Sequence, residues 1–262
     1  MDGYNAAFQI YNSFIATAVI YGLLLAVVLF FVFARKRGFP YIHLGLVSLC
    51  GIISQAVVVN PVITSADYGK TVPGVLYVYV IFSSIQYLIM FLIPVHVAFQ
   101  QSKENANSKS KQSEARRLAY IGFFLAFIVI SLLIIALIFI GSTDGTYSDY
   151  KKIYTFSSLY LAYAMLHWAL ILLWIVIALV LRKEISSIGT FTGFGFLLIL
   201  MMVGITINAI GGGVQNATIV FTVFWAHLFL YHVCCFIAIL VACYFGTIWT
   251  HANSVNSTEP SA

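Results

Sequence analysis

Seven apolar runs, each long enough to cross a lipid bilayer, dominate this chain of 262 residues. None of the seven contains Asp, Glu, Lys or Arg. About 20 apolar residues, rising about 1.5 Å each, suffice for one helical crossing. The runs lie at about residues 14–34, 41–60, 75–99, 118–140, 156–181, 191–210 and 219–246. We therefore predict an all-α integral membrane protein, a single domain built as a bundle of seven transmembrane helices.

The overall composition agrees with a membrane-embedded chain. Charged residues make up only 8% of the sequence, against about 25% in soluble domains, and the mean hydropathy is +1.00. The formal net charge of +5 is scattered in short clusters beside the apolar runs, so nucleic acid is not an expected partner. Membrane lipids are expected partners, in the plasma membrane or an endomembrane.

The basic residues predict which way the bundle crosses the membrane. Ten of the thirteen Lys and Arg residues follow the first, third and fifth runs: Arg35, Lys36, Arg37, Lys103, Lys109, Lys111, Arg116, Arg117, Arg182 and Lys183. Positively charged loops stay in the cytoplasm, so we predict the N-terminus outside and the C-terminus cytoplasmic. On the cytoplasmic side we expect a flexible loop at residues 100–117 and a short polar tail at residues 250–262.

Polar side chains within the runs are the candidate functional residues, because polar groups inside lipid are costly and usually face the bundle interior. On the fifth run, Tyr163 and His167 share a helical face at a spacing of four, as His227 and Tyr231 do on the seventh. At α-helical spacing His232 lies about 140° away from His227, so these two histidines are not expected to serve one small site.

These faces predict a polar and aromatic crevice that opens outward. Its candidate ligand-binding residues are Gln86, Tyr163, His167, His227 and Tyr231. A receptor-like or ligand-sensing protein is the first hypothesis, with a cytoplasmic signalling protein as its partner at residues 100–117 and 182–189. The alternative for each residue is structural, since a lone histidine or glutamine in a span often just bonds a neighbouring helix.

Two other functions stay open. One is transmembrane electron transfer through a b-type haem, held by two histidines from different spans at matched depth. His167 with His232 meets that condition, as does His43 with His96. A lipid- or protein-handling helper would need only an uncharged bundle. No retinal Schiff base is expected in the seventh run, which lacks lysine, and no span carries the carboxylates that an intramembrane hydrolase or metal enzyme normally needs.

Short motifs carry one resemblance to a known group. Arg37-Gly38-Phe39 follows the first run, Ser48-Leu49 to Gln55 lies in the second, and Gly145-Thr146-Tyr147 precedes the fifth. In this order the chain resembles uncharacterised seven-span integral membrane proteins of fungi. That resemblance implies the seven-span layout and no known activity. The number of spans and the predicted outside N-terminus also match the general topology of G-protein-coupled receptors.

Overall fold

The computed structural model describes residues 3–35, 39–64, 73–105, 108–141, 149–211 and 217–250. These residues are almost entirely helical, and none of them forms a strand. Seven helical segments are long and apolar enough to cross a membrane. The prediction of an all-α bundle of seven spans is thus confirmed, and the chain is a multi-pass membrane protein.

The first six spans are single α-helices, and the seventh is interrupted. The elements are α1 (Gly3–Arg35), α2 (Tyr41–Thr64), α3 (Pro73–Gln100), α4 (Lys109–Gly141), α5 (Asp149–Val180) and α6 (Ile188–Gly211). A short π-helix, η1 (Gln101–Asn105), continues α3. The seventh span consists of α7 (Ala217–His227), the π-helix η2 (Leu228–Val233) and α8 (Cys234–Trp249).

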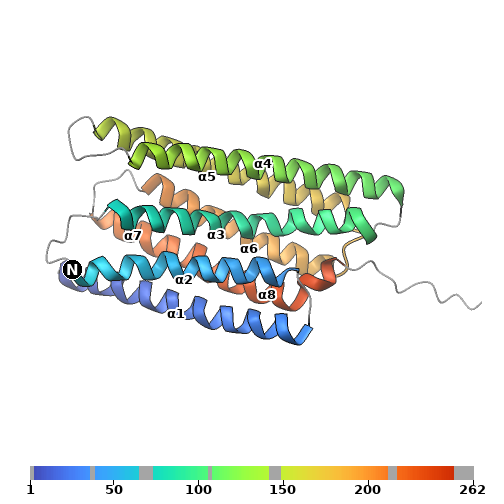
Figure 1. The fold of residues 1–262 in the computed structure, drawn as a ribbon, viewed down its shortest axis with the longest axis horizontal. Helices are drawn as coiled ribbons and strands as arrows, with labels where there is room; N and C mark the ends of the chain where they lie inside the picture. The colour runs from blue at the N-terminus through green and yellow to red at the C-terminus, as the bar shows by residue number, and fades with distance from the viewer. Residues whose placement is uncertain are drawn as a thin grey trace, which may run out of the picture.

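The helices run side by side along the long axis of the molecule (Figure 1). Helix α1 packs against α2 and α8, α4 packs against α3 and α5, and α6 lies between α5 and the seventh span. Helix α3 touches α2, α4 and α5, and its span is the most buried of the seven, whereas those of α1 and α4 are the least buried. We refer to the end of the bundle where α1 begins as the amino-terminal end, and to the opposite end as the carboxyl-terminal end.

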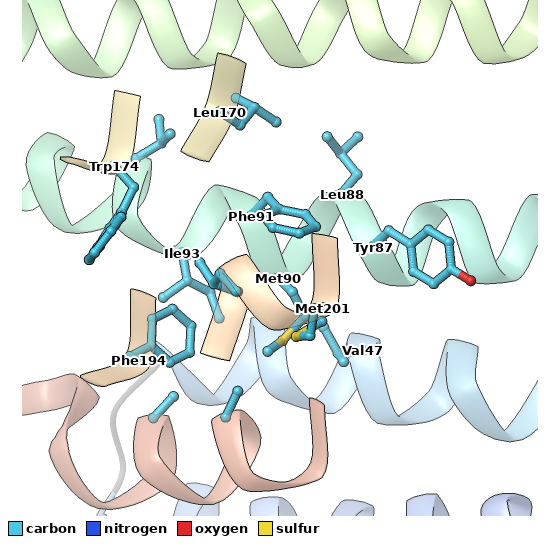
Figure 2. Packing of buried hydrophobic residues seen from close by; sticks show 14 of the residues in the cluster. Val47, Tyr87, Leu88, Met90, Phe91, Ile93, Leu170, Trp174, Phe194 and Met201 are labelled. Atoms are coloured by element: carbon cyan, nitrogen blue, oxygen red, sulfur yellow. The ribbon is translucent and has the colours of Figure 1, made fainter. Parts of the chain in front are cut away.

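Close packing around α3 holds the bundle together. Figure 2 shows Met90 and Phe91 of α3 among Val47 of α2, Trp174 of α5 and Phe194 of α6. Inside a membrane, helix association depends on van der Waals packing and interhelical hydrogen bonds rather than on release of water from apolar surface. Side chains that interlock on α3 therefore set the relative positions of its neighbours.

The segment predicted as a flexible loop at residues 100–117 is largely helical. Residues 101–105 form η1, and α4 begins at Lys109. The segment is polar but rich in good helix formers, and the ammonium of Lys111 lies 2.7 Å from the carboxylate of Glu114, one helical turn away. Polarity alone is therefore a poor sign of a loop here.

Some predictions concern residues that the structure does not describe. They include Lys36 and Arg37, residues 145–147, and the polar tail beyond Thr250. The orientation of the bundle across the membrane stays a prediction from the basic residues.

Candidate functional site

A group of polar and aromatic side chains lies buried where the seventh span meets α1 and α3. We call it the central cluster, and its members are Tyr21, Gln86, Tyr87, His227, Tyr231, His232 and Cys235. None of these residues is more than 5% exposed. Three of the predicted ligand-binding residues, Gln86, His227 and Tyr231, are thus brought into one cluster.

The π-helix η2 brings both histidines of the seventh span into this cluster. A π-helix bonds residue i to residue i+5, so residues five apart lie on a similar side of the helix. The rings of His227 and His232 lie 5.4 Å apart, and His227 also stacks on Tyr231 at 5.3 Å. The prediction that His232 points about 140° away from His227 is therefore wrong, because it assumed α-helical spacing throughout.

Glycine on α6 allows η2 to approach closely. A Cβ atom added at Gly204 would lie 3.1 Å from the backbone nitrogen of Tyr231 and from the Cβ of Leu230. The carbonyl oxygen of Gly204 lies 3.2 Å from Nδ1 of His227. A carbonyl can only accept, so Nδ1 of His227 carries the proton and its Nε2 accepts the weak hydrogen bond from the Tyr87 hydroxyl at 3.4 Å.

Helix α1 joins the cluster through one tyrosine. The hydroxyl of Tyr21 lies 3.0 Å from Nδ1 of His232, and the two rings meet edge to face. Gly51 of α2 lies behind this pair, since a Cβ there would come within 2.7 Å of the Tyr21 ring and 2.8 Å of Nε2 of Gln86. Tyr21 and Tyr87 were missed in the sequence because tyrosines are common in membrane spans and neither lies on the histidine-bearing faces.

The two candidates on α5 form a separate group, which we call the α5 pair. Tyr163 donates a hydrogen bond to the Ser84 carbonyl oxygen at 3.2 Å, and His167 packs edge to face on Phe91. Nδ1 of His167 lies 2.9 Å from the Tyr163 carbonyl oxygen and so carries the proton, which leaves Nε2 as an acceptor. The α5 pair therefore contacts α3 at Ser84 and Phe91, and the central cluster includes Gln86 and Tyr87 of the same helix.

Three buried polar atoms in these groups lack an oxygen or nitrogen partner. They are Oε1 of Gln86, Nε2 of His167 and the hydroxyl of Tyr231, which faces the thiol of Cys235. Nε2 of Gln86 lies 4.0 Å from the Cys235 sulfur, and the Gln86 amide also interacts with the Tyr21 hydroxyl. An unpaired buried polar group costs about 1–3 kcal/mol, so such groups call for an explanation.

The candidate residues are closed off in this conformation rather than exposed in an open crevice. Exposure of the five predicted residues runs from 0% to 5%. A ligand that reached them would need the helices around α3 to separate.

The two histidines proposed for haem lie in different surroundings. His167 contacts Phe91 and Tyr163, whereas the ring of His232 contacts Tyr21, His227, Tyr231 and Phe236. A haem held by this pair would replace side chains that now pack against each ring. The rings of His43 and His96 do meet, 4.7 Å apart, towards the carboxyl-terminal end. Within the described residues no three His, Cys, Asp or Glu side chains gather as a metal site would need.

A second buried group joins the segments that were predicted to carry the signal. We call it the closing cluster, and its members are the buried Gln101, Phe191, Phe194 and Trp249 and, at its edge, the half-buried Thr190. The Gln101 amide donates to the carbonyl oxygens of Trp249 at 2.9 Å and Glu184 at 3.4 Å. The indole of Trp249 donates to the Thr190 hydroxyl at 2.9 Å. One glutamine thus links η1 to the end of α8 and to the turn between α5 and α6.

The comparisons with other proteins leave this site to be interpreted from its own geometry. No protein-family model, no curated protein and no solved structure matches the chain.

Proposed function

We propose that this integral membrane protein is a receptor-like, ligand-sensing protein in which the central cluster and the α5 pair recognise the ligand. The observation that carries the proposal is that three of the nine buried side-chain atoms without a hydrogen-bond partner in the described structure lie in these two groups: Gln86 Oε1, His167 Nε2 and the Tyr231 hydroxyl. They lie inside a bundle whose spans were predicted to be free of charge.

Energetics favour a functional role for these atoms over a structural one. An interhelical hydrogen bond within a membrane contributes about 0.6–2 kcal/mol, which accounts for pairs such as Tyr21 with His232. An unpaired buried group instead costs about 1–3 kcal/mol. Leucine, methionine or phenylalanine at these positions would therefore stabilise the bundle better. Local costs of this kind are expected at functional sites.

The chemistry of these atoms indicates the class of ligand. Gln86 Oε1 and His167 Nε2 are acceptors, and the Tyr231 hydroxyl can donate or accept. The surrounding side chains are aromatic or aliphatic and carry no charge. A small, neutral, largely apolar molecule with one or two O–H or N–H donors fits this set of groups.

The signal would leave along α3. This helix carries Gln86 and continues into η1, where Gln101 bonds to the end of α8 and to the turn after α5. A ligand that shifts α3 against the seventh span would therefore strain the bonds of Gln101. The predicted cytoplasmic partner would bind the segments at 100–117 and 182–189.

A thermal-unfolding screen in lipid nanodiscs tests the proposal. Neutral donor-bearing compounds are screened against the wild type, the double variant Gln86→Met/Tyr231→Phe, and the control Tyr244→Phe, which alters an exposed tyrosine on α8. A ligand at 100 times its dissociation constant adds about 2.7 kcal/mol to the folded state. We expect hits to stabilise the wild type and the control but not the double variant. Hits that stabilise all three proteins equally would refute the site.

A further inference from the structure

A groove of about 330 Å³ lies at the carboxyl-terminal end of the bundle, between the start of α4 and the end of α5. It is lined by Lys111, Glu114, Arg117, Leu118 and Val180. It shares no residue with the central cluster or the α5 pair, so it is a separate feature from the proposed ligand site.

The polar side of this groove carries a net positive charge. The Lys111 ammonium lies 2.7 Å from the Glu114 carboxylate and 3.4 Å from the Val180 carbonyl oxygen, which fixes Lys111 across the gap from α4 to α5. Arg117 forms no hydrogen bond or ion pair with any residue in the described part of the chain. Within that part of the chain the Arg117 guanidinium is thus an unpaired donor fork, beside an ammonium that Glu114 already holds.

The apolar side of the groove lies where the hydrocarbon region begins. Leu118 is the first residue of the long apolar part of α4, and Val180 ends α5. Arg117 and Leu118 are consecutive, so the groove changes from basic to apolar along its own length. That change matches a phospholipid, whose phosphate lies at the interface and whose acyl chains begin directly below it.

We propose that this groove binds the head group of an anionic phospholipid from the surrounding leaflet. The Arg117 guanidinium and the third donor of the Lys111 ammonium hold the phosphate, and Leu118 and Val180 contact the start of the acyl chains. Basic pockets between spans on the cytoplasmic side bind such lipids in this way, and the positive-inside prediction places the groove on that side.

Native mass spectrometry of the detergent-purified full chain tests this site, with phosphatidylglycerol and phosphatidylcholine of identical acyl chains as probes. We expect phosphatidylglycerol to bind more tightly than phosphatidylcholine. Arg117→Gln should weaken phosphatidylglycerol binding about fivefold, the effect of one basic group near an anionic surface. Arg116→Gln is the matched control, because this neighbour is also exposed on α4 but does not line the groove. Equal losses in both variants would overturn the proposal in favour of diffuse surface charge.

A second variant separates a lipid from a free phosphate or a protein partner. Leu118→Ala removes part of the apolar floor and should weaken phosphatidylglycerol binding while leaving binding of water-soluble glycerol phosphate unchanged. Glycerol phosphate that displaces the lipid completely at equal concentration would overturn the lipid assignment. Phosphatidylcholine binding as tight as phosphatidylglycerol binding would overturn the proposed selectivity for an anionic head group.

Discussion

The central cluster and the closing cluster use their polar groups in different ways. In the closing cluster the Gln101 amide bonds to two backbone carbonyl oxygens, and only its own Oε1 stays open. In the central cluster the interhelical bonds of Tyr21 and Tyr87 run from side chain to side chain. A backbone carbonyl moves only with its helix, whereas side-chain pairs can exchange partners by rotation. Each cluster also has one bond of the other kind, from Trp249 to the Thr190 hydroxyl in the closing cluster and from His227 to the Gly204 carbonyl oxygen in the central cluster. The closing cluster is therefore the better suited to hold the bundle, because one glutamine joins three segments through two backbone atoms.

The largest effect is expected at Trp249 in the closing cluster. Trp249 is fully buried against Phe191 and Phe194, so Trp249→Ala leaves a cavity and also removes the bond to Thr190. We expect the free energy of unfolding to fall by about 3–5 kcal/mol, measured by SDS titration in mixed micelles. The control Tyr244→Ala removes a side chain of α8 that is 56% exposed and meets the Phe31 ring edge to face, so it should lower this free energy much less. A small loss at Trp249 would mean that this end does not hold the bundle.

An intermediate effect is expected where α2 supports the central cluster. Gly51→Ala would press a methyl group against the Tyr21 ring and the Gln86 amide. We expect a loss of about 1–3 kcal/mol in the same assay, the usual cost of overpacking. Gly22→Ala is the control, since a Cβ at Gly22 has no neighbour within 4 Å. Equal stability of the two variants would show that the cluster is loose enough to admit a methyl group.

A smaller effect is expected from removing one bonded hydroxyl. Tyr21→Phe removes the bond to Nδ1 of His232 and leaves that nitrogen without its partner. We expect the midpoint of thermal unfolding to fall, for a loss of about 0.6–2 kcal/mol. A rise in that midpoint would contradict the assignment of this contact as a stabilising bond.

The smallest effect is expected at the tyrosine that lacks an oxygen or nitrogen partner. Tyr231→Phe keeps the ring contacts with Tyr87 and His227 and deletes only a hydroxyl that faces a thiol, a weak partner. Thermal unfolding should therefore occur at the wild-type temperature or above it. Comparison with Tyr21→Phe separates bonded from unbonded hydroxyls within one cluster.

The seven spans and the polar faces could be predicted from the sequence because both depend on local residue order. Apolar runs without charges report the spans, and the spacing of four joins Tyr163 to His167 and His227 to Tyr231. The π-helix η2 could not be predicted, since Leu228–Val233 is as apolar as the α-helical residues on either side. This π-helix fits closely against Gly204 of α6, and its spacing brings His232 beside His227.

The start of α4 and the burial of the site were also beyond the sequence. Residues 109–117 are polar enough for a loop, but their helix propensity and contacts with α5 keep them helical. Whether Gln86 and Tyr231 face an open crevice or a closed interior depends on how side chains from α1, α2 and α3 interlock. No periodicity within one span reports that arrangement.

The most direct test is the unfolding free energy of the double variant Gln86→Met/Tyr231→Phe, compared with the wild type in the same lipid. These changes keep side-chain size and delete three polar atoms. Two of them, Gln86 Oε1 and the Tyr231 hydroxyl, have no oxygen or nitrogen partner in the described structure, and the third, Gln86 Nε2, lies 4.0 Å from the Cys235 sulfur. We predict a double variant at least as stable as the wild type, as expected when unpaired polar groups are replaced by apolar ones of similar shape. A loss of more than about 2 kcal/mol would show that these atoms hold the bundle together, and would contradict their assignment to ligand sensing.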